Sequence, residues 1–251
     1  YYKLQVTQKG IYRVSFNDFK AAGIPTDIDP TTLQLYRRGR EVAIFVQGEA
    51  DKKFDAADYL EFYGEESNGE ADSTIYKPVA AQPNKYVNVY TDSAAFFLTW
   101  RLDGKAGKRM AAYQQENTTQ LAPEPYHYAE ILKYYLNGYS QGNVYPLGVN
   151  SGPVYSYYDF GEGWSDIVYN RSNSIEHSLQ LTNAYKEGGA PTLEWQFNGY
   201  SITPHRLELN IGNSAATKRK LTNAEFEFRG DYSFNTTLAW ADVGSNGNLY
   251  L

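Results

Sequence analysis

The sequence predicts an all-β fold: two β-sandwich-like domains with one or two short helices. Its 251 residues include 24 tyrosines and 12 phenylalanines but only one methionine, and aromatic residues favour pleated, half-buried surfaces. Apolar and polar residues alternate through many short segments, which is the period of a strand with one buried face. Gly, Asn, Pro and Asp separate these segments as in a β-sandwich, and a jelly roll is one topology open to the second domain.

The first two strands are expected to form a hairpin. Apolar residues alternate from Tyr2 to Val6 and again from Tyr12 to Phe16, and Gln8-Lys9-Gly10 supplies a turn between them. A short helix is expected to follow from Asp18 to Ala22, with Asn17 or Ser15 as its capping residue and Gly23 as its end.

A second hairpin is expected from Leu33 to Val46, with its reversal at Arg38-Gly39. The basic cluster Arg37 to Arg40 is therefore assigned to a solvated turn rather than to a phosphate site. The next segment, DKKFDAADYLEFYG from Asp51 to Gly64, opens with an acidic turn and continues as an alternating strand. We expect this strand to lie centrally in its sheet.

Further strands are expected from Tyr86 to Tyr90 and from Ala94 to Leu102. The segment Gln114 to Pro125 has no hydrophobic period and carries two prolines, so the domain boundary is placed within it. The expected domains are an N-terminal β domain, residues 1–118, and a β-sandwich domain, residues 119–251.

The second domain is expected to begin with Tyr126 to Gly138, which can form a helix or a strand pair because its periodicity does not decide. Beyond a passage rich in Gly and Tyr, the period-two pattern returns and predicts several strands. Its apolar positions are Ile175, His177, Leu179 and Leu181; Leu193, Trp195 and Phe197; Leu207, Leu209 and Ile211; Phe226 and Phe228; and Leu238 and Trp240.

Charge and composition argue against several classes of function. The formal net charge is −6, which argues against nucleic acid and anionic membranes as partners. The chain has no cysteine, so it holds no thiolate nucleophile or thiolate metal site. No apolar segment approaches the roughly 18 residues of a membrane-spanning helix. Because the chain starts and ends within alternating segments, we expect it to be an excerpt of a larger protein.

The sequence shows no catalytic constellation, and we assign no catalytic, cofactor-binding or metal-binding residue. The three histidines, His127, His177 and His205, lack the close spacing of zinc ligands. His177 is in register with Ile175 and Leu179, which favours a buried structural histidine over a catalytic base.

Calcium is the one cofactor that the sequence leaves open. Asp51, Asp55 and Asp58 lie close together in the chain, and calcium accepts oxygen ligands from a flexible loop. Their spacing does not fit the EF-hand pattern. The same carboxylates are suited to accept backbone hydrogen bonds in the turn before the strand, which is the favoured interpretation.

Aromatic side chains at loop ends can stack on sugar rings or form protein contacts. The candidates for such a platform are Tyr155, Tyr157, Tyr158, Trp164 and Tyr200. In sheets, alternating aromatic residues more often belong to the core or to cross-strand pairs.

Four ordered motifs carry a family resemblance. They are YYKLQVTQKGIYRVSFNDFKAAGI (Tyr1 to Ile24), LQLYRRGREVAIFV (Leu33 to Val46), FDAADYLEFYGE (Phe54 to Glu65), and YTDSAAFFLTW with GKRM (Tyr90 to Trp100 and Gly107 to Met110). Together they resemble the N-terminal region of the gingipain-type cysteine peptidases of Bacteroidetes, a family that includes the PorU-like sortases of the type IX secretion system. The resemblance covers about residues 1–110 and is looser in the second half.

The resemblance implies a non-catalytic front end of a bacterial cell-surface protein, extracellular and associated with the outer membrane. In that family the catalytic Cys and His lie in a downstream peptidase domain, so no catalytic residue carries over to this chain. The implied partners are proteins: the downstream peptidase domain and an outer-membrane β-barrel. A carbohydrate-binding β-sandwich module and a structural adhesin are the alternative functions.

Overall fold

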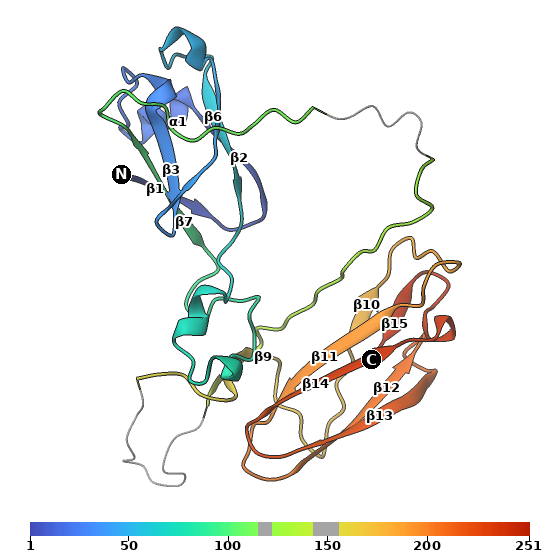
Figure 1. The fold of residues 1–251 in the computed structure, drawn as a ribbon. Helices are drawn as coiled ribbons and strands as arrows, with labels where there is room; N and C mark the ends of the chain where they lie inside the picture. Colours follow the sequence, from blue (N-terminus) through green and yellow to red (C-terminus); the bar gives the residue numbers. More distant parts are fainter. Residues whose placement is uncertain (115–121, 143–155) are drawn as a thin grey trace. The chain divides into compact units, whose positions relative to one another are not determined.

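The computed structural model describes residues 1–114, 122–142 and 156–251 (Figure 1). The regular secondary structure of these residues is mostly strands in antiparallel sheets, which confirms the all-β fold. The chain divides into two compact units. Unit 1 comprises Tyr1–Asn68 and Tyr90–Leu121, and unit 2 comprises Gly69–Val89 and Ala122–Leu251.

Unit 1 is a sandwich of two antiparallel sheets. One sheet has the strand order β1-β7-β3-β4, and the other has the order β2-β6-β5. The elements of unit 1 are β1 (Tyr2–Val6), β2 (Gly10–Ser15), α1 (Phe16–Ala21), η1 (Pro30–Thr32), β3 (Leu33–Arg37), β4 (Arg40–Val42), β5 (Phe45–Gln47), η2 (Glu49–Asp51), β6 (Tyr59–Gly64) and β7 (Ala94–Trp100).

The core of unit 1 lies between its two sheets. Leu60 and Phe62 of β6 are fully buried, whereas Tyr63 is exposed, as the alternation in this strand predicts. The ring of Phe62 lies 5.1 Å from the ring of Phe96 on the opposite sheet. Strand β6 pairs with β2 on one side and β5 on the other, which confirms its central position.

The expected hairpin of the first two strands is wrong. Strand β1 pairs with β7, and β2 pairs with β6, so the turn after Val6 carries the chain from one sheet to the other. Each strand buries alternate residues against the shared core, which explains the period-two pattern of both. Periodicity identifies the buried face of a strand and leaves its hydrogen-bonding partner undetermined.

Two local sequence features of unit 1, the helix cap and the hairpin turn, predict the structure correctly. Ser15 caps α1: its hydroxyl accepts a hydrogen bond from the Asp18 amide, and the Asp18 carboxylate accepts one from the Ser15 amide. Strands β3 and β4 form the expected hairpin, and Arg38 and Gly39 at its tip both have positive φ values, as a type I′ turn requires.

Unit 2 contains a four-stranded sheet with the order β10-β15-β12-β13 and two two-stranded ladders, β11-β14 and β8-β9. Leu193 of β11 packs with Ile211 of β12 and Leu249 of β15, so the β11-β14 ladder lies against the larger sheet. Its elements are η3 (Ala71–Thr74), η4 (Val79–Ala81), β8 (Gly138–Gln141), β9 (Glu162–Ser165), β10 (Ser178–Gln180), β11 (Thr192–Asn198), β12 (His205–Gly212), β13 (Lys218–Phe226), β14 (Asp231–Thr237), η5 (Trp240–Asp242) and β15 (Asn248–Tyr250).

The division into units differs from the expected domains. The expected boundary near residue 118 lies outside the described residues, and Gly69–Val89 groups with unit 2 although it precedes that boundary. The buried Tyr76 donates its hydroxyl hydrogen bond to the carbonyl of Glu162 at 2.8 Å. The indole of Trp164 donates to the carbonyl of Val89 at 3.0 Å. These long-range contacts attach residues 69–89 to β9. They cannot be predicted from a local sequence pattern.

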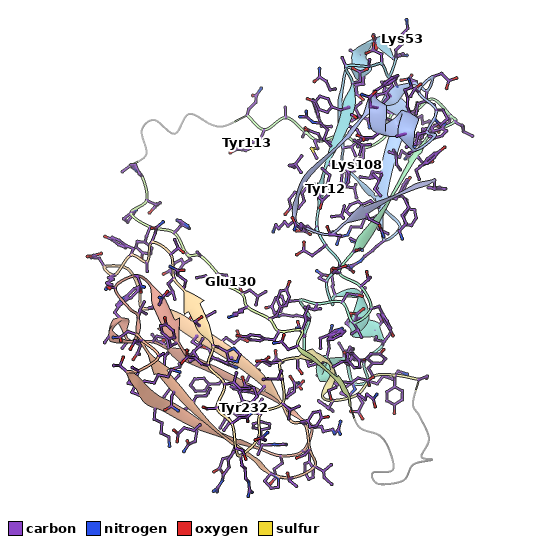
Figure 2. All side chains as sticks on the ribbon, turned by 180° about the vertical axis from the view of Figure 1, so that it is seen from behind. Tyr12, Lys53, Lys108, Tyr113, Glu130 and Tyr232 are labelled. Atoms are coloured by element: carbon purple, nitrogen blue, oxygen red, sulfur yellow. The ribbon has the colours of Figure 1, made fainter. Side chains whose placement is uncertain are left out.

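Two further expectations in this region are wrong. Residues 86–90 form bends instead of a strand, because side chains bind the amides that a ladder would use: Asn84 accepts from Tyr86, and Asp72 accepts from Val89. Residues 126–137 form neither a helix nor a strand pair, and most of their side chains are exposed. Glu130 marks this irregular segment in Figure 2.

Asp231, the first residue of β14, makes the stability of unit 2 depend on pH. Its carboxylate accepts a hydrogen bond from the Asn198 side chain, and burial raises its pKa to about 6. Because this pKa is higher in the folded than in the unfolded chain, the folded state holds the proton more tightly. The contribution of Asp231 to the free energy of unfolding is therefore expected to be fully present below pH 4 and to be lost as the pH rises through 6.

Asp231→Asn keeps the shape and the acceptor oxygen but does not titrate. We expect it to stabilise unit 2 by about 1–2 kcal/mol at pH 7.5, the full shift being reduced for partial exposure, and to have little effect at pH 4. Urea unfolding monitored by tryptophan fluorescence at both pH values measures this, since unit 2 holds three of the four tryptophans. An equal effect at both pH values would show that the carboxylate does not titrate in this range.

Candidate functional site

A groove of about 2100 Å³ within unit 2 is the main candidate site among the described residues. Its walls come from the irregular residues 128–135, from residues 163–171 and 173–177, and from strands β11 and β12. Small-molecule sites in proteins usually enclose about 300–1,000 Å³, so this groove is large enough for part of a polypeptide.

Large apolar side chains line the groove and remain accessible to solvent. Ile131 and Ile167 are each 49% exposed, Val168 is 47% exposed and Tyr134 is 44% exposed. Exposed apolar patches of this kind are typical of surfaces that contact other proteins. The chain carries them on irregular segments, where no hydrophobic period marks them in the sequence.

A polar cluster around His177 lies at the buried side of the groove. Nε2 of His177 is 2.6 Å from the hydroxyl of Tyr169 and 3.1 Å from Oδ2 of Asp166. The imidazole also packs against the rings of Tyr135 and Trp195, at centroid distances of 4.5 and 5.5 Å. Mutual backbone hydrogen bonds between His177 and Leu251 hold this residue at the end of the β10-β15 ladder.

The cluster is buried, and burial shifts the pKa values of its histidine and tyrosines toward their neutral forms. Burial lowers the pKa of His177 below its usual value, while the carboxylate of Asp166 opposes this shift and Lys133 adds to it. Burial also raises the pKa of the Tyr169 hydroxyl, and the charge of Asp166 acts in the same direction. The pKa of Tyr135 is raised to about 12 for the same two reasons.

Sequence reasoning placed His177 correctly as a buried residue: it is 7% exposed. It missed Asp166, Tyr169 and Tyr135, which come from irregular segments without a periodic pattern. The other two histidines lie elsewhere: His127 is exposed, and His205 stacks on Phe226 at 4.9 Å and contacts the carbonyl of Ser201. Within the described part of the chain, no three His, Cys, Asp or Glu side chains are grouped to hold a metal.

The three aspartates of the candidate calcium loop bind backbone amides. Asp51 accepts from the Lys53 amide at 2.9 Å, Asp55 from the Ala57 amide at 3.3 Å, and Asp58 from the Asp55 amide at 2.8 Å. These bonds form the turn that leads into β6, as the favoured interpretation expects. A calcium site here stays a prediction.

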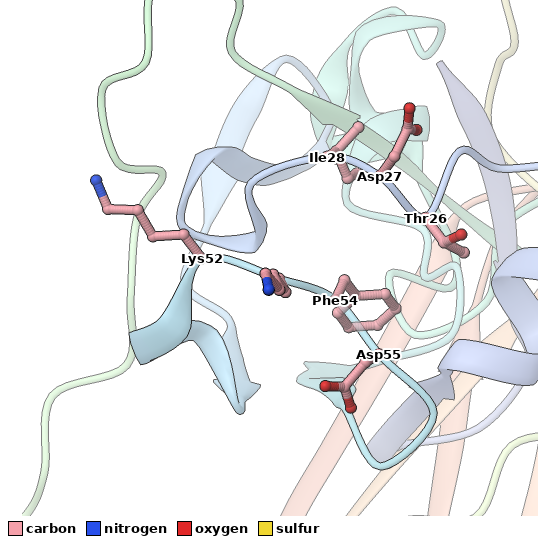
Figure 3. A pocket seen from close by; sticks show the side chains of 7 residues that line it. Thr26, Asp27, Ile28, Lys52, Phe54 and Asp55 are labelled. Carbon is pink, nitrogen blue, oxygen red and sulfur yellow. The ribbon is translucent and has the colours of Figure 1, made fainter.

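A pocket of about 280 Å³ lies beside this loop in unit 1 (Figure 3). The ring of Phe54 lines it, together with Thr26, Ile28 and Lys52. Figure 3 shows the carboxylates of Asp27 and Asp55 pointing away from each other, so they do not converge on a common ligand.

The aromatic candidates do not form a shared platform. Tyr155 lies outside the described residues. Tyr158 packs edge-on against Tyr76, and Trp164 packs edge-on against Tyr139. Tyr200 is 55% exposed, and the guanidinium of Arg229 lies 5.8 Å from its ring centre. Tyr157, half-buried, faces the ammonium group of Lys77 at 5.3 Å.

Comparison of the chain with family models, with curated proteins and with solved structures finds no match. The functional argument for this chain therefore depends on its own residues.

Proposed function

We propose that this chain is a non-catalytic, β-rich binding region of an exported, cell-surface protein of the gingipain-like, PorU-like type, and that it acts through protein contacts. The supporting observation is the groove of unit 2, whose volume of about 2100 Å³ exceeds that of ordinary small-molecule sites. The apolar side chains along it remain exposed in the isolated chain, as expected for a surface that another protein covers.

The proposed occupant of the groove is the peptidase domain that the sequence resemblance implies downstream in the same polypeptide. A covalently linked partner has a high effective concentration, so a groove of modest intrinsic affinity is sufficient to hold it. In the described part of the chain, no helix is long and apolar enough to cross a membrane. An extracellular location and an outer-membrane β-barrel as a second partner belong to the same proposal.

The complete gene sequence provides the first test, because the proposal requires an encoded gingipain-type domain downstream. That domain, produced separately, is then titrated with this chain by calorimetry. Ile131→Asp and Val168→Asp place a charge in the groove and are expected to weaken binding at least tenfold. Leu102→Asp is the matched control: Leu102 is 93% exposed and belongs to unit 1, so its replacement is expected to leave binding unchanged.

A gene without that domain, or equal binding by all three variants, would contradict the proposal. A carbohydrate ligand is distinguished by a glycan-binding screen, in which binding abolished by Tyr200→Ala and retained by Val168→Asp would favour a sugar module. A structural adhesin is distinguished by concentration-dependent self-association of the isolated chain.

A further inference from the structure

One side of strand β12 (His205–Gly212) faces the groove of unit 2 without a strand beside it. Strand β12 pairs with β13 along its whole length, whereas on its other side it pairs, among the described residues, with β15 at Gly212 alone. Residues 205–210 of β12 line the groove. An unpaired strand edge carries main-chain donors and acceptors that another strand can bind.

The hydrogen bonds at the end of β15 show which main-chain groups of β12 are directed toward the groove. Leu251 exchanges two backbone hydrogen bonds with His177, so its amide and carbonyl face away from β12. These groups alternate between the two sides of an antiparallel strand, so those of Tyr250, which pairs with Gly212, face β12. The same alternation directs every second residue of β12 to the groove side, namely Arg206, Glu208 and Asn210.

The space beside this edge has the width of one strand. The sheet order is β10-β15-β12, so β10 and β12 are two strand spacings apart, or about 9.5 Å. Past Leu251 the groove takes the middle position, between β12 on one side and residues 173–177, which precede β10, on the other. Residues 205–210 border this space over about 20 Å, the length of a six-residue strand.

The neighbouring side chains specify what kind of strand fits. Leu207 and Leu209 lie on the core side of β12, whereas Arg206 and Glu208 on the opposite side are exposed. A strand beside β12 shares these two faces, so it must be apolar at every second residue. Leu251 is buried on the core side. In the register of β15, the second and fourth residues joined to Leu251 lie opposite Leu209 and Leu207.

We propose that the free edge of β12 accepts one extended strand, which continues β15 and lies antiparallel to β12. The strand comes from the polypeptide that follows Leu251 in the proposed gingipain-like protein, so this source rests on the proposed function. A segment joined to Leu251 enters the groove without a turn, because Tyr250 is already in register with Gly212. Main-chain hydrogen bonds supply the affinity of such a strand, and its alternating apolar side chains supply the specificity.

Two designed extensions of the isolated chain test the edge itself. Thr-Val-Thr-Val-Thr-Val joined to Leu251 places its valines on the core side. It is expected to raise the melting temperature of unit 2 and to slow amide hydrogen exchange, measured by NMR, at least tenfold at Glu208 and Asn210. Val-Thr-Val-Thr-Val-Thr is the matched control, because it has the same composition but places its valines on the solvent side. It is expected to leave both quantities near those of the unmodified chain.

The complete gene product tests the source of the strand. The same two amides are expected to exchange at least tenfold more slowly in it than in the isolated chain. Protection that grows with protein concentration would show a strand from a second copy and overturn the linked source. Protection by the first extension but not in the complete product would overturn the linked source as well.

The free edge as a strand-binding site is overturned if neither extension protects these amides, or if both protect them equally. A gene without a gingipain-type domain would contradict the proposed function, and it would leave the result of the two designed extensions unaffected. The two proposals therefore fail in distinguishable ways.

Discussion

Phe62→Ala is expected to lower the free energy of unfolding of unit 1 by about 3–5 kcal/mol, the usual cost of removing a buried aromatic ring. Phe62 is 1% exposed in the central strand β6, and its ring contacts Tyr12 and, across the sandwich, Phe96. The alanine leaves a cavity where the two sheets meet, and strands on both sides lose contacts. Hydrogen exchange in peptides covering residues 2–64 measures the loss within unit 1.

Tyr63→Ala is the control for this prediction. Tyr63 is the next residue in the same strand, is 42% exposed and points to the opposite face. Its replacement is expected to cost less than about 1 kcal/mol, because it removes little buried surface. A larger cost for Tyr63 than for Phe62 would show that β6 is displaced by one residue, since such a shift exchanges the two faces of a strand.

Arg109→Met is expected to destabilise unit 1 by about 2–4 kcal/mol, because the guanidinium satisfies several backbone carbonyls at once. It donates to the carbonyls of Pro30 at 2.8 Å, Thr31 at 2.7 Å and Leu33 at 3.1 Å, and forms an ion pair with Glu49 at 2.8 Å. Met keeps much of the volume but none of the donors. Hydrogen exchange at the start of β3 reports the loss.

Three variants separate the sources of this effect. Lys108→Met changes the exposed neighbour and is expected to be neutral. Glu49→Gln removes the charge of the partly exposed ion pair and is expected to cost less than about 1 kcal/mol. Arg109→Lys is expected to be nearly as unstable as Arg109→Met. One ammonium group cannot donate to all of the carbonyls that the planar guanidinium binds at once. Full rescue by lysine would contradict the assigned role.

Arg109 also explains part of the pattern in the N-terminal motifs. The amide of Gly107 donates to the carbonyl of Thr31 at 3.0 Å, and a Cβ atom on Gly107 would lie 2.0 Å from the carbonyl oxygen of Leu33. The GKRM motif therefore requires glycine, because the backbone of Leu33 lies too close for a side chain. It requires arginine to donate hydrogen bonds to the carbonyls of residues 30–33. Two motifs that are distant in the chain are adjacent in the fold because of these contacts.

Alternating apolar residues predicted the strands of the core well. The segments around Leu35, Phe62, Leu98, Trp195 and Leu209 all form strands with the expected buried faces. The prediction of strands failed in segments where apolar and polar residues do not alternate clearly. Strands β13 and β14 are largely polar, so the apolar pattern locates only their ends: Phe226 ends β13 and Phe228 lies in the following turn. Leu238 follows β14 and Trp240 begins η5, so the strand expected there is wrong. Residues 86–90 have a strand-like composition, but their amides bind side-chain acceptors.

The site could be predicted only in part. The alternation around His177 indicated its burial, since the residue occupies an apolar position in its segment. Asp166 and Tyr169 reach it from an irregular segment, where side-chain direction depends on long-range packing and follows no local period. The groove escaped prediction for the same reason, because its walls are irregular chain.

Hydrogen exchange of the groove in the complete gene product, compared with that of the isolated chain, tests the central claim most directly. The proposed docking of a downstream domain predicts slower exchange in residues 128–135 and 166–176 of the complete product, with unit 1 unchanged. Val168→Asp is expected to remove this difference. Equal exchange in the groove of both proteins would contradict the claim that a linked protein domain covers it.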